Sequence, residues 1–349
     1  MERIYSLLML WVLLGFSCSP QVEQNQQVDF QPARKIPVII LTDINNAGGD
    51  PDDKQSWIHV LWYADVLDIR GLVPDYWTGK GYEAAMEGLE AYESDFKQFE
   101  FAQKGYPMPD TLRNRTAPND SLAVELIYQE AMASSEPLYI LIWGQMKTFR
   151  QTLFEHPEIA DKVRVLTIGT GRKYGPKDEV AGTDCNVVNW NGPGRNDIYD
   201  DPRFHQMWWL ENNWTYNGMF SGTRPAEMFD TLATFGAMGA HIKTVVKDHP
   251  WAQYFRVGDT PTVLYLIDEN HNPDDPTQSS WAGKFAQPFP DTRPNYYTDD
   301  SGNIEWDYTD PCNTWENLKG MYAYNKSTLE ERREEMYEAL LEKLNDLYN

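Results

Sequence analysis

Short apolar runs alternate with segments of helical periodicity through the first half of the chain. The runs "PVIILTD" (37–43), "DIRGLVP" (68–74), "PLYILIWG" (137–144) and "VRVLTIGTG" (163–171) have the length and composition of buried strands. Residues 52–67, 81–99, 121–134 and 145–162 place their apolar positions at helical spacing. This alternation predicts an α/β fold with a mostly parallel central sheet flanked by helices.

Polar residues follow several of these runs, in "TDINN", "IWGQ", "IGTGRK" and "TDCNVVNWN". Ligands of parallel sheets bind beyond the carboxyl ends of the strands. We therefore expect these segments to share one rim. After residue 270 the pattern gives way to long Pro-, Asp- and Trp-rich loops, and a final helix is predicted over residues 327–348, where Ser327 and Glu330 have capping-box spacing.

The first 18 residues are predicted to be a signal peptide of the lipoprotein type. Arg3 precedes the apolar run "IYSLLMLWVLLGF", and Cys18 follows it as the lipid-bearing residue. Residues 19–34 are expected to be a polar tether, and residues 35–349 a single domain. This predicts an exported protein of the bacterial periplasm or outer membrane that contacts membrane only through its anchor. The remaining cysteines, Cys185 and Cys312, permit a disulfide without requiring one.

The net charge of −23 excludes nucleic acid as a partner, because no basic surface is available for a phosphate backbone. The chain contains 13 Trp and 20 Tyr. Such an aromatic content fits either a large core or walls that stack on sugar rings, and composition leaves both open. The oligomeric state is also open, with a homo-oligomer as one option.

The stretch "LTDINNAGGDPDDKQSW" (41–57) crowds carboxylates between a strand-like run and a helix-like run. A calcium loop of the EF-hand kind is excluded, because its fifth and twelfth positions would be Ala47 and Lys54. A phosphate-binding loop would need a Lys after its glycines and fewer acids. Two interpretations remain: a solvated turn that caps a helix, or a site for a hard cation with oxygen ligands.

A second acidic feature lies far along the chain in "GDTPTVLYLI" (258–267), where Asp259 precedes Pro261 and an apolar run. Alone, Asp259 fits a helix N-cap as well as a ligand. It could supply a further ligand to a cation held at the acidic turn, and both interpretations of Asp259 stay open.

These features, in order, resemble the nucleoside hydrolase family, and more closely its divergent exported relatives once described as cellulose-binding. The resemblance covers residues 36–290 and is carried by "VIILTD", "GGDPDDKQS", "LYILIWGQMKTFRQTLFEHPEIADKVRVLTIGTG", "TDCNVV", "GDTPTVLYLI" and "SSWAGKF". It implies the Rossmann-like fold of that family and a carbohydrate or nucleoside ligand.

The resemblance also implies a set of site residues. Calcium would be held by Asp43, Asp53 and Asp259, with the Trp143 backbone carbonyl as a further ligand. Asp43 would take a proton from a calcium-bound water that attacks the anomeric carbon of a furanose. The residues expected to contact sugar hydroxyls are Asp52, Asp184 and Asn186. Trp77 and Trp190 are expected to contact the substrate for another reason, because they lie on the predicted rim of the sheet and could stack on a sugar or base.

The chain departs from typical nucleoside hydrolases at the leaving-group end. Gly258 stands where those enzymes carry a His. The segment "NNA" lengthens the acidic turn, so Asp50 could replace Asp43 or Asp53 in its role. The sequence therefore predicts an exported calcium-dependent glycosidase that hydrolyses an N- or O-glycosidic bond of a furanose-like sugar in a small glycoside or oligosaccharide. The alternative is a non-catalytic glycan-binding lipoprotein on the same fold.

Overall fold

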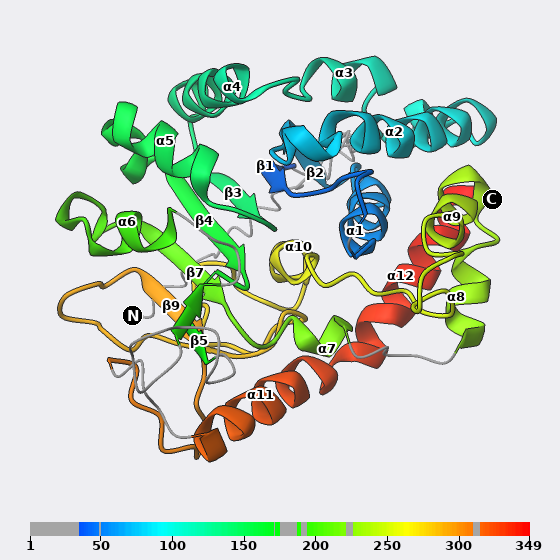
Figure 1. Cartoon of the computed structure of the whole chain (residues 1–349). Helices are drawn as coiled ribbons and strands as arrows, with labels where there is room; N and C mark the ends of the chain where they lie inside the picture. The colour runs from blue at the N-terminus through cyan, green and yellow to red at the C-terminus, as the bar shows by residue number, and fades with distance from the viewer. Residues whose placement is uncertain are drawn as a thin grey trace, which may run out of the picture. The chain divides into compact units, whose positions relative to one another are not determined.

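The apolar runs form the parallel core of a seven-stranded sheet in the order β2-β1-β3-β4-β7-β9-β8 (Figure 1). The computed structural model describes residues 35–48, 50–170, 172–174, 187–189, 194–220, 226–309 and 315–349. All neighbours in the sheet pair in parallel except β8 and β9. The strands are β1 (Ile36–Thr42), β2 (Leu67–Pro74), β3 (Leu138–Ile142), β4 (Val163–Ile168), β7 (Trp208–Asn212), β8 (Phe285–Ala286) and β9 (Tyr296–Asp299). The predicted fold class is confirmed.

Helices cover both faces of this sheet, and a separate antiparallel pair joins β5 (Arg172–Tyr174) to β6 (Val187–Asn189). The α-helices are α1 (Asp52–Leu61), α2 (Gly81–Gln98), α3 (Pro109–Asn114), α4 (Asp120–Ala133), α5 (Lys147–Glu155), α6 (Arg195–Asp200), α7 (Asn217–Phe220), α8 (Ala226–Leu232), α9 (Gly236–Thr244), α10 (Pro261–Ile267), α11 (Trp315–Glu330) and α12 (Arg333–Tyr348). Single 3₁₀ turns are η1 (Trp77–Gly79), η2 (Phe101–Lys104), η3 (Pro157–Asp161) and η4 (Pro202–Phe204).

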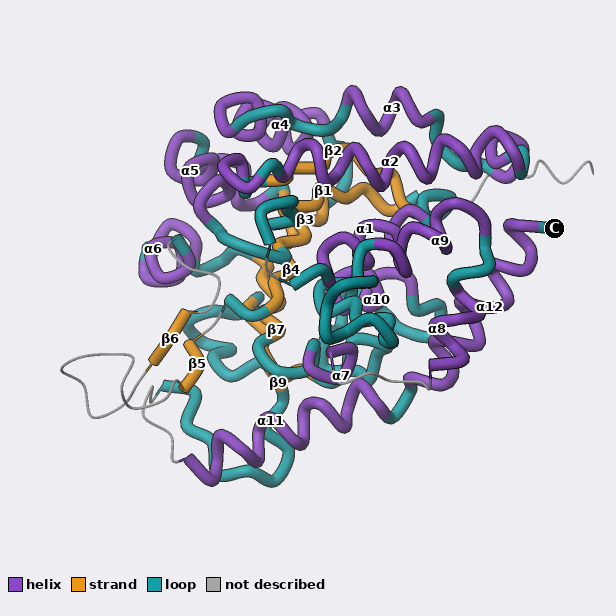
Figure 2. Tube along the Cα trace, turned by 45° about the vertical axis from the view of Figure 1, so that its right-hand side comes forward, coloured by secondary structure: helices purple, strands orange, loops and turns teal. Residues whose placement is uncertain are grey.

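Alternate side chains of the central strands enter different apolar layers. Val38 and Ile40 of β1 pack with residues of α1, α2, α9, α10 and α12. Ile39 and Leu41 face the opposite layer, built with α4, α5 and α6. Figure 2 shows the strands enclosed between these two groups of helices. A strand that is buried on both faces reads as a continuous apolar run, which is why the sequence locates β1 correctly.

The strand order fixes where a ligand site can form. β1 pairs with β2 on one side and with β3 on the other. The connection from β1 to β2 and the connection from β2 to β3 therefore run toward opposite edges of the sheet. In open parallel sheets the crevice outside such a reversal point receives the ligand. The acidic turn follows β1 directly, at this point. Of the helices in the described part of the chain, none combines the length and apolar character that a membrane span requires.

Three predicted helices differ from the observed ones. The helix predicted over 52–67 ends at Leu61 and gives way to β2, while the helix predicted over 145–162 ends at Glu155, because Pro157 follows. The predicted capping box is wrong. Ser327 and Glu330 lie in the last turn of α11, and the Ser327 hydroxyl donates to the Tyr324 carbonyl at 2.7 Å.

A buried carboxylate joins three helices behind the acidic site. Asp95 of α2 accepts hydrogen bonds from the amides of Ala237 and Met238, at the start of α9, and from the hydroxyl of Tyr348, at the end of α12. Their distances are 2.6, 2.9 and 2.7 Å. Asp95 thus caps α9 from another helix.

Asp95→Ala is expected to destabilise the protein by about 2 kcal/mol, since a lost helix cap costs up to about that amount. Denaturant unfolding followed by circular dichroism measures this loss. The matched control is Asp110→Ala, which removes an exposed carboxylate and should change the unfolding free energy by less than about 0.5 kcal/mol. Equal effects of the two variants would contradict a capping role for Asp95.

Candidate functional site

Thr42, the last residue of β1, holds the acidic turn against the strand. Its hydroxyl donates a hydrogen bond to the Asp53 carboxylate and accepts one from the amide of Ile44 at 3.0 Å. The first bond draws the start of α1 toward the end of β1. Asp43, which lies between these anchored residues, is therefore presented at the rim of the sheet.

The inserted residues "NNA" form an ordered turn. The Asn45 side chain donates to the Asp43 carbonyl at 3.0 Å and accepts from the Ala47 amide at 3.0 Å. The amide of Asn46 donates to the carbonyl of Gly79 at 2.8 Å, which ties the turn to η1. The insertion thus makes the turn rigid without adding a carboxylate.

The carboxylates of the turn converge. Oxygens of Asp50, Asp52 and Asp53 lie within 4.8 Å of one another. Asp50 is exposed, whereas Asp52 and Asp53 are only 5% and 6% exposed. No side-chain cap hydrogen bond forms at the start of α1. This burial excludes the solvated turn as an account of Asp52 and Asp53.

Asp259 lies just before α10, far from the turn in sequence, and its charge acts on Asp52 and Asp53. It is 3% exposed, and its Oδ2 atom is buried without a hydrogen-bond partner among the described residues. The N-cap of α10 is Thr260, so the cap interpretation of Asp259 is wrong. A buried carboxylate oxygen without a donor is costly unless a proton or a cation binds it. This orphaned oxygen fits the ligand interpretation.

Electrostatic interactions link all four predicted carboxylates. Burial raises the pKa values of Asp52 and Asp53 well above the ordinary range, and the charge of Asp259 is the next cause for both. Burial, followed by the charge of Asp50, raises the pKa of Asp43 to about 6. Burial and then Asp43 raise the pKa of Asp259 well above normal. Two like charges 4 Å apart repel by about 4 kcal/mol near a protein surface, so protons or a cation must compensate this cluster.

Two glycines leave room for these carboxylates. A Cβ atom at Gly144, two residues after the end of β3, would lie 2.8 Å from the Asp43 carboxylate. A Cβ atom at Gly258 would lie 2.7 Å from Asp52 Oδ2 and 2.6 Å from the Phe220 ring. Any larger residue at either position would collide with these atoms, so both positions require glycine.

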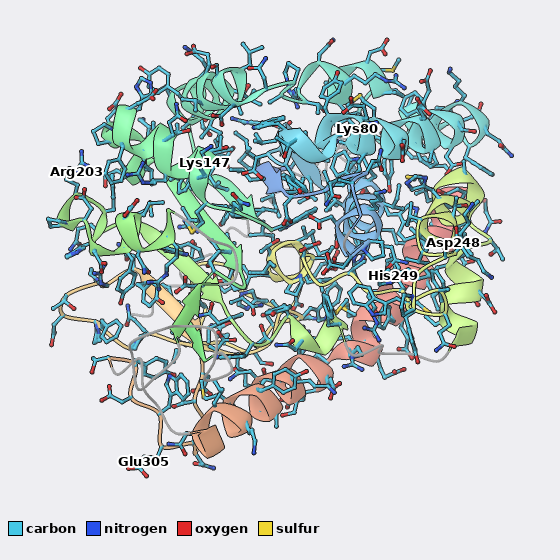
Figure 3. The ribbon with its side chains drawn as sticks, viewed as in Figure 1. Lys80, Lys147, Arg203, Asp248, His249 and Glu305 are labelled. Carbon is cyan, nitrogen blue, oxygen red and sulfur yellow. The ribbon has the colours of Figure 1, made fainter. Side chains whose placement is uncertain are left out.

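Asp75 is a further carboxylate of the site that sequence reasoning missed. It follows β2, and its amide donates to the Thr42 carbonyl at 3.0 Å. Its Oδ2 atom is buried without a hydrogen-bond partner in the described part of the chain. Burial raises its pKa well above normal, followed by the charge of Asp43, while Lys147 at the start of α5 opposes the shift (Figure 3). A prediction that β2 pairs in parallel with β1 would have located Asp75, because this pairing places Pro74 beside Thr42.

An aromatic and cationic wall stands beside Asp52. The Phe220 ring lies 4.8 Å from the Trp251 ring, edge to face. The Arg256 guanidinium stacks on Trp251 at 4.6 Å. Burial lowers the pKa of Arg256, and the charge of Asp52 opposes this. Arg256 therefore places a positive charge near the acidic cluster.

Asp43, Asp52, Asp53 and Asp259 shift one another's pKa values, whereas the carboxylate oxygens found within 4.8 Å of one another in the described residues are those of Asp50, Asp52 and Asp53. The predicted tryptophans differ from one another in their placement. The Trp143 side chain is buried, and its Nε1 donates to Thr262 Oγ1 at 2.8 Å. Trp77 is half-buried in η1 and packs against the second apolar layer. The predicted roles of Trp77 and of the Trp143 carbonyl stay predictions. Three predicted residues lie outside the described part of the chain: Asp184, Asn186 and Trp190.

Residues 37–285 match the family described as "cellulose-binding Sde182, nucleoside hydrolase-like domain". The chain belongs to this nucleoside hydrolase-like family. The match covers all of the strands and carboxylates described above as far as β8, which confirms the predicted resemblance. A comparison with curated proteins found no match.

One solved structure supports the fold, and two others show weaker similarity. A nucleoside hydrolase-related protein from Saccharophagus degradans that is associated with carbohydrate metabolism superposes with a TM-score of 0.60. It is 16% identical, over 90% of this chain and 72% of its own. An inosine-guanosine nucleoside hydrolase gives a TM-score of 0.48 at 12% identity, over 90% of this chain and 98% of its own. The inosine-uridine preferring enzyme from Bacillus anthracis gives 0.42 at 10%, over 83% and 99%.

Gly258→His, which would introduce the histidine of typical nucleoside hydrolases, is expected to destabilise this family member by about 1–3 kcal/mol through overpacking. The Phe220 ring occupies the space that the new side chain would enter. Thermal denaturation measures the effect. The double variant Gly258→His with Phe220→Ala should recover part of the loss, and an unchanged melting temperature in the single variant would contradict the steric argument.

Proposed function

We propose that this protein is an exported, calcium-dependent glycosidase that hydrolyses an N- or O-glycosidic bond of a furanose-like sugar. The observation that carries the proposal is the mutual charge interaction of the buried carboxylates Asp43, Asp52, Asp53 and Asp259, with a buried oxygen of Asp259 that has no donor among the described residues. Calcium binds six to eight hard oxygen ligands and suits such a donor set.

Each carboxylate has a distinct role in this proposal. Asp53 and Asp259 would hold the cation together with Asp43 and the Trp143 carbonyl. When bound, the cation lowers the pKa of the attacking water and orients it. Asp43 would accept the proton of that water, because it is the least buried member of the inner cluster and can be reached from the substrate side.

The remaining carboxylates act on the sugar. Asp52 would accept hydrogen bonds from sugar hydroxyls, with Asp184 and Asn186 as further contacts. Buried negative charge around the ring stabilises the cationic, oxocarbenium-like transition state of glycosidic cleavage. The water-excluding wall of Phe220 and Trp251 strengthens this interaction.

A second function has its own support: non-catalytic binding of a glycan. The family is described as cellulose-binding. At the leaving-group end, Gly258 supplies no side chain and Phe220 fills the adjacent space. A protein with an intact sugar-binding half and no leaving-group acid at this position would bind a glycoside without cleaving it.

A panel of nucleosides and aryl furanosides, assayed with calcium and with a chelator, separates the two functions. The glycosidase proposal expects release of free sugar that requires calcium. Calorimetric binding of a glycan without product after long incubation would favour the binding protein. Hydrolysis that chelation leaves unchanged would contradict the metal mechanism.

Export and lipid anchoring at Cys18 are proposed from the sequence alone. Cys18→Ser is expected to release the protein from the membrane fraction of an expressing bacterium into the soluble fraction. Radiolabelled palmitate should mark the native chain and leave the variant unlabelled. Equal labelling of both would contradict anchoring at Cys18.

A further inference from the structure

A cavity of about 410 Å³ opens at the carboxyl ends of β7 and β9. This volume lies within the range of small-molecule sites. Its lining does not include Asp43, Asp52, Asp53 or Asp259. The cavity is therefore separate from the acidic cluster and calls for its own explanation.

The floor of the cavity is rigid. Glu211 is fully buried and accepts hydrogen bonds from Arg195 Nε at 2.8 Å, Thr170 Oγ1 at 2.9 Å and the Tyr296 hydroxyl at 2.6 Å. The charge of Arg195 is thereby committed to Glu211. The Arg195–Glu211 pair holds this side of the cavity in one geometry. Its hydrogen-bonding groups are mostly used within the protein, so few of them remain for a ligand.

Asp299 is committed in the same way. Its carboxylate accepts the backbone amides of Asn213, Trp214 and Thr215 at 2.6, 2.9 and 3.0 Å. These bonds fix the loop after β7, which brings Trp214 to the cavity lining. A preorganised wall lowers the entropy that a ligand must lose on binding.

Arg293 has a different environment. Its guanidinium lies 3.7 Å from the centre of the Tyr199 ring, which also stacks against Arg195 at 4.0 Å. Among the described residues, Arg293 makes no ion pair and no side-chain hydrogen bond. A guanidinium presents five N–H donors in a planar fork that matches a carboxylate. Arg293 is thus a positioned cation whose donors remain for a ligand, in a chain of net charge −23.

Aromatic rings make up much of the remaining lining, among them Trp214, Phe289, Trp306 and Tyr308. Flat rings bury the apolar faces of sugars, and polar groups at the edge bond to hydroxyls. The exposed carboxylates of Asp200 and Asp307 also line the cavity, which disfavours a ligand of several negative charges.

We propose that this cavity binds a single sugar residue that carries a carboxylate, with Arg293 gripping the carboxylate and the aromatic lining stacking on the ring. The site is independent of calcium and of the hydrolysis proposed above. It gives the protein a means of selecting acidic glycans, whichever function the acidic cluster performs.

Methyl β-D-glucuronide and methyl β-D-glucoside test the proposal, because they differ only at the carbon that bears the carboxylate. Titrations followed by ligand-observed NMR are expected to show tighter binding of the glucuronide. Arg293→Met should weaken glucuronide binding about tenfold, as expected for loss of a charge-assisted hydrogen bond, and leave the glucoside unchanged.

The matched control is Arg203→Met. Arg203, labelled in Figure 3, also stacks on aromatic rings and pairs with Asp201. It does not belong to the cavity lining. Its loss should leave both affinities unchanged, and melting temperatures confirm that each variant folds. Arg293→Lys, which keeps the charge and loses the fork, should fall between native and Arg293→Met.

Several results would overturn the proposal. The first two are equal affinity of the native protein for the two glycosides and no binding of either glycoside. The third is a preference for the glucuronide that remains in Arg293→Met. The fourth is a preference for the glucuronide that is lost to the same extent in Arg203→Met and Arg293→Met. Propionate that binds as tightly as the glucuronide would show a simple anion site and overturn the sugar assignment. Asp43→Asn should leave glucuronide binding intact, which separates failure here from failure of the proposed hydrolysis.

Discussion

Asp43→Asn is expected to lower the rate of calcium-dependent hydrolysis by about 10²–10⁴-fold, the usual contribution of a positioned general base. An amide cannot accept the proton of the attacking water. The carboxylate lies against Gly144 at the reversal point of the sheet. Steady-state assays at saturating calcium measure the loss on whichever glycoside of the panel is cleaved.

Saturating calcium is essential to this comparison, because Asp43 is also a proposed ligand. A variant that only loses metal affinity would recover its rate as calcium rises, whereas a variant that loses the base would not. Asp110→Asn, at an exposed position that pairs with Arg113, provides a control with the same chemical change. Native activity in Asp43→Asn at high calcium would refute its role as the base.

Calcium is expected to stabilise the protein strongly at pH 7.5 and weakly near pH 4. Without the cation, carboxylates with raised pKa values favour the protonated native state. Stability is therefore present below the unfolded pKa of about 3.8 and is lost as pH rises through the folded values, which include about 6 for Asp43. Calcium at one hundred times its dissociation constant would restore about 2.7 kcal/mol at pH 7.5.

Thermal unfolding with calcium and with a chelator, at several pH values, measures this effect. Asp259→Asn provides a signature that a general packing defect would not give. In chelator at pH 7.5 the variant should melt at a higher temperature than the native protein, because it relieves repulsion with Asp43, Asp52 and Asp53. In calcium it should melt at a lower temperature. A native protein indifferent to calcium would refute the cation site.

The strands nearest the acidic turn were predictable from sequence because they are buried on both faces. The run at Ile36–Thr42 has no polar position before its last residue, and such runs have few alternatives. The strand at Tyr296–Asp299 was missed, because proline and aspartate surround a run of only four residues. It becomes a strand through pairing with β7.

Local rules failed where distant packing decides. Ser327 and Glu330 have the spacing of a helix start, yet α11 already extends through them, because Leu318 and Met321 are buried against Trp214. The candidate site contains residues that local sequence motifs located and one that they did not. Asp43 and Asp259 were found because each lies in a recognisable motif, whereas Asp75 has no motif and joins them only through the pairing of β2 with β1.

The Gln55 side chain has a consequence for the order of folding. It donates to the carbonyls of Ile242 and Tyr254, 187 and 199 residues away, and accepts from the amide of Arg256 at 2.8 Å. These bonds fasten α1 to the segment that delivers Asp259. Contacts so distant in sequence form late, since a long loop must close first. A cation bound at Asp43, Asp53 and Asp259 would therefore slow unfolding while leaving the refolding rate unchanged, and so extend the lifetime of the folded protein.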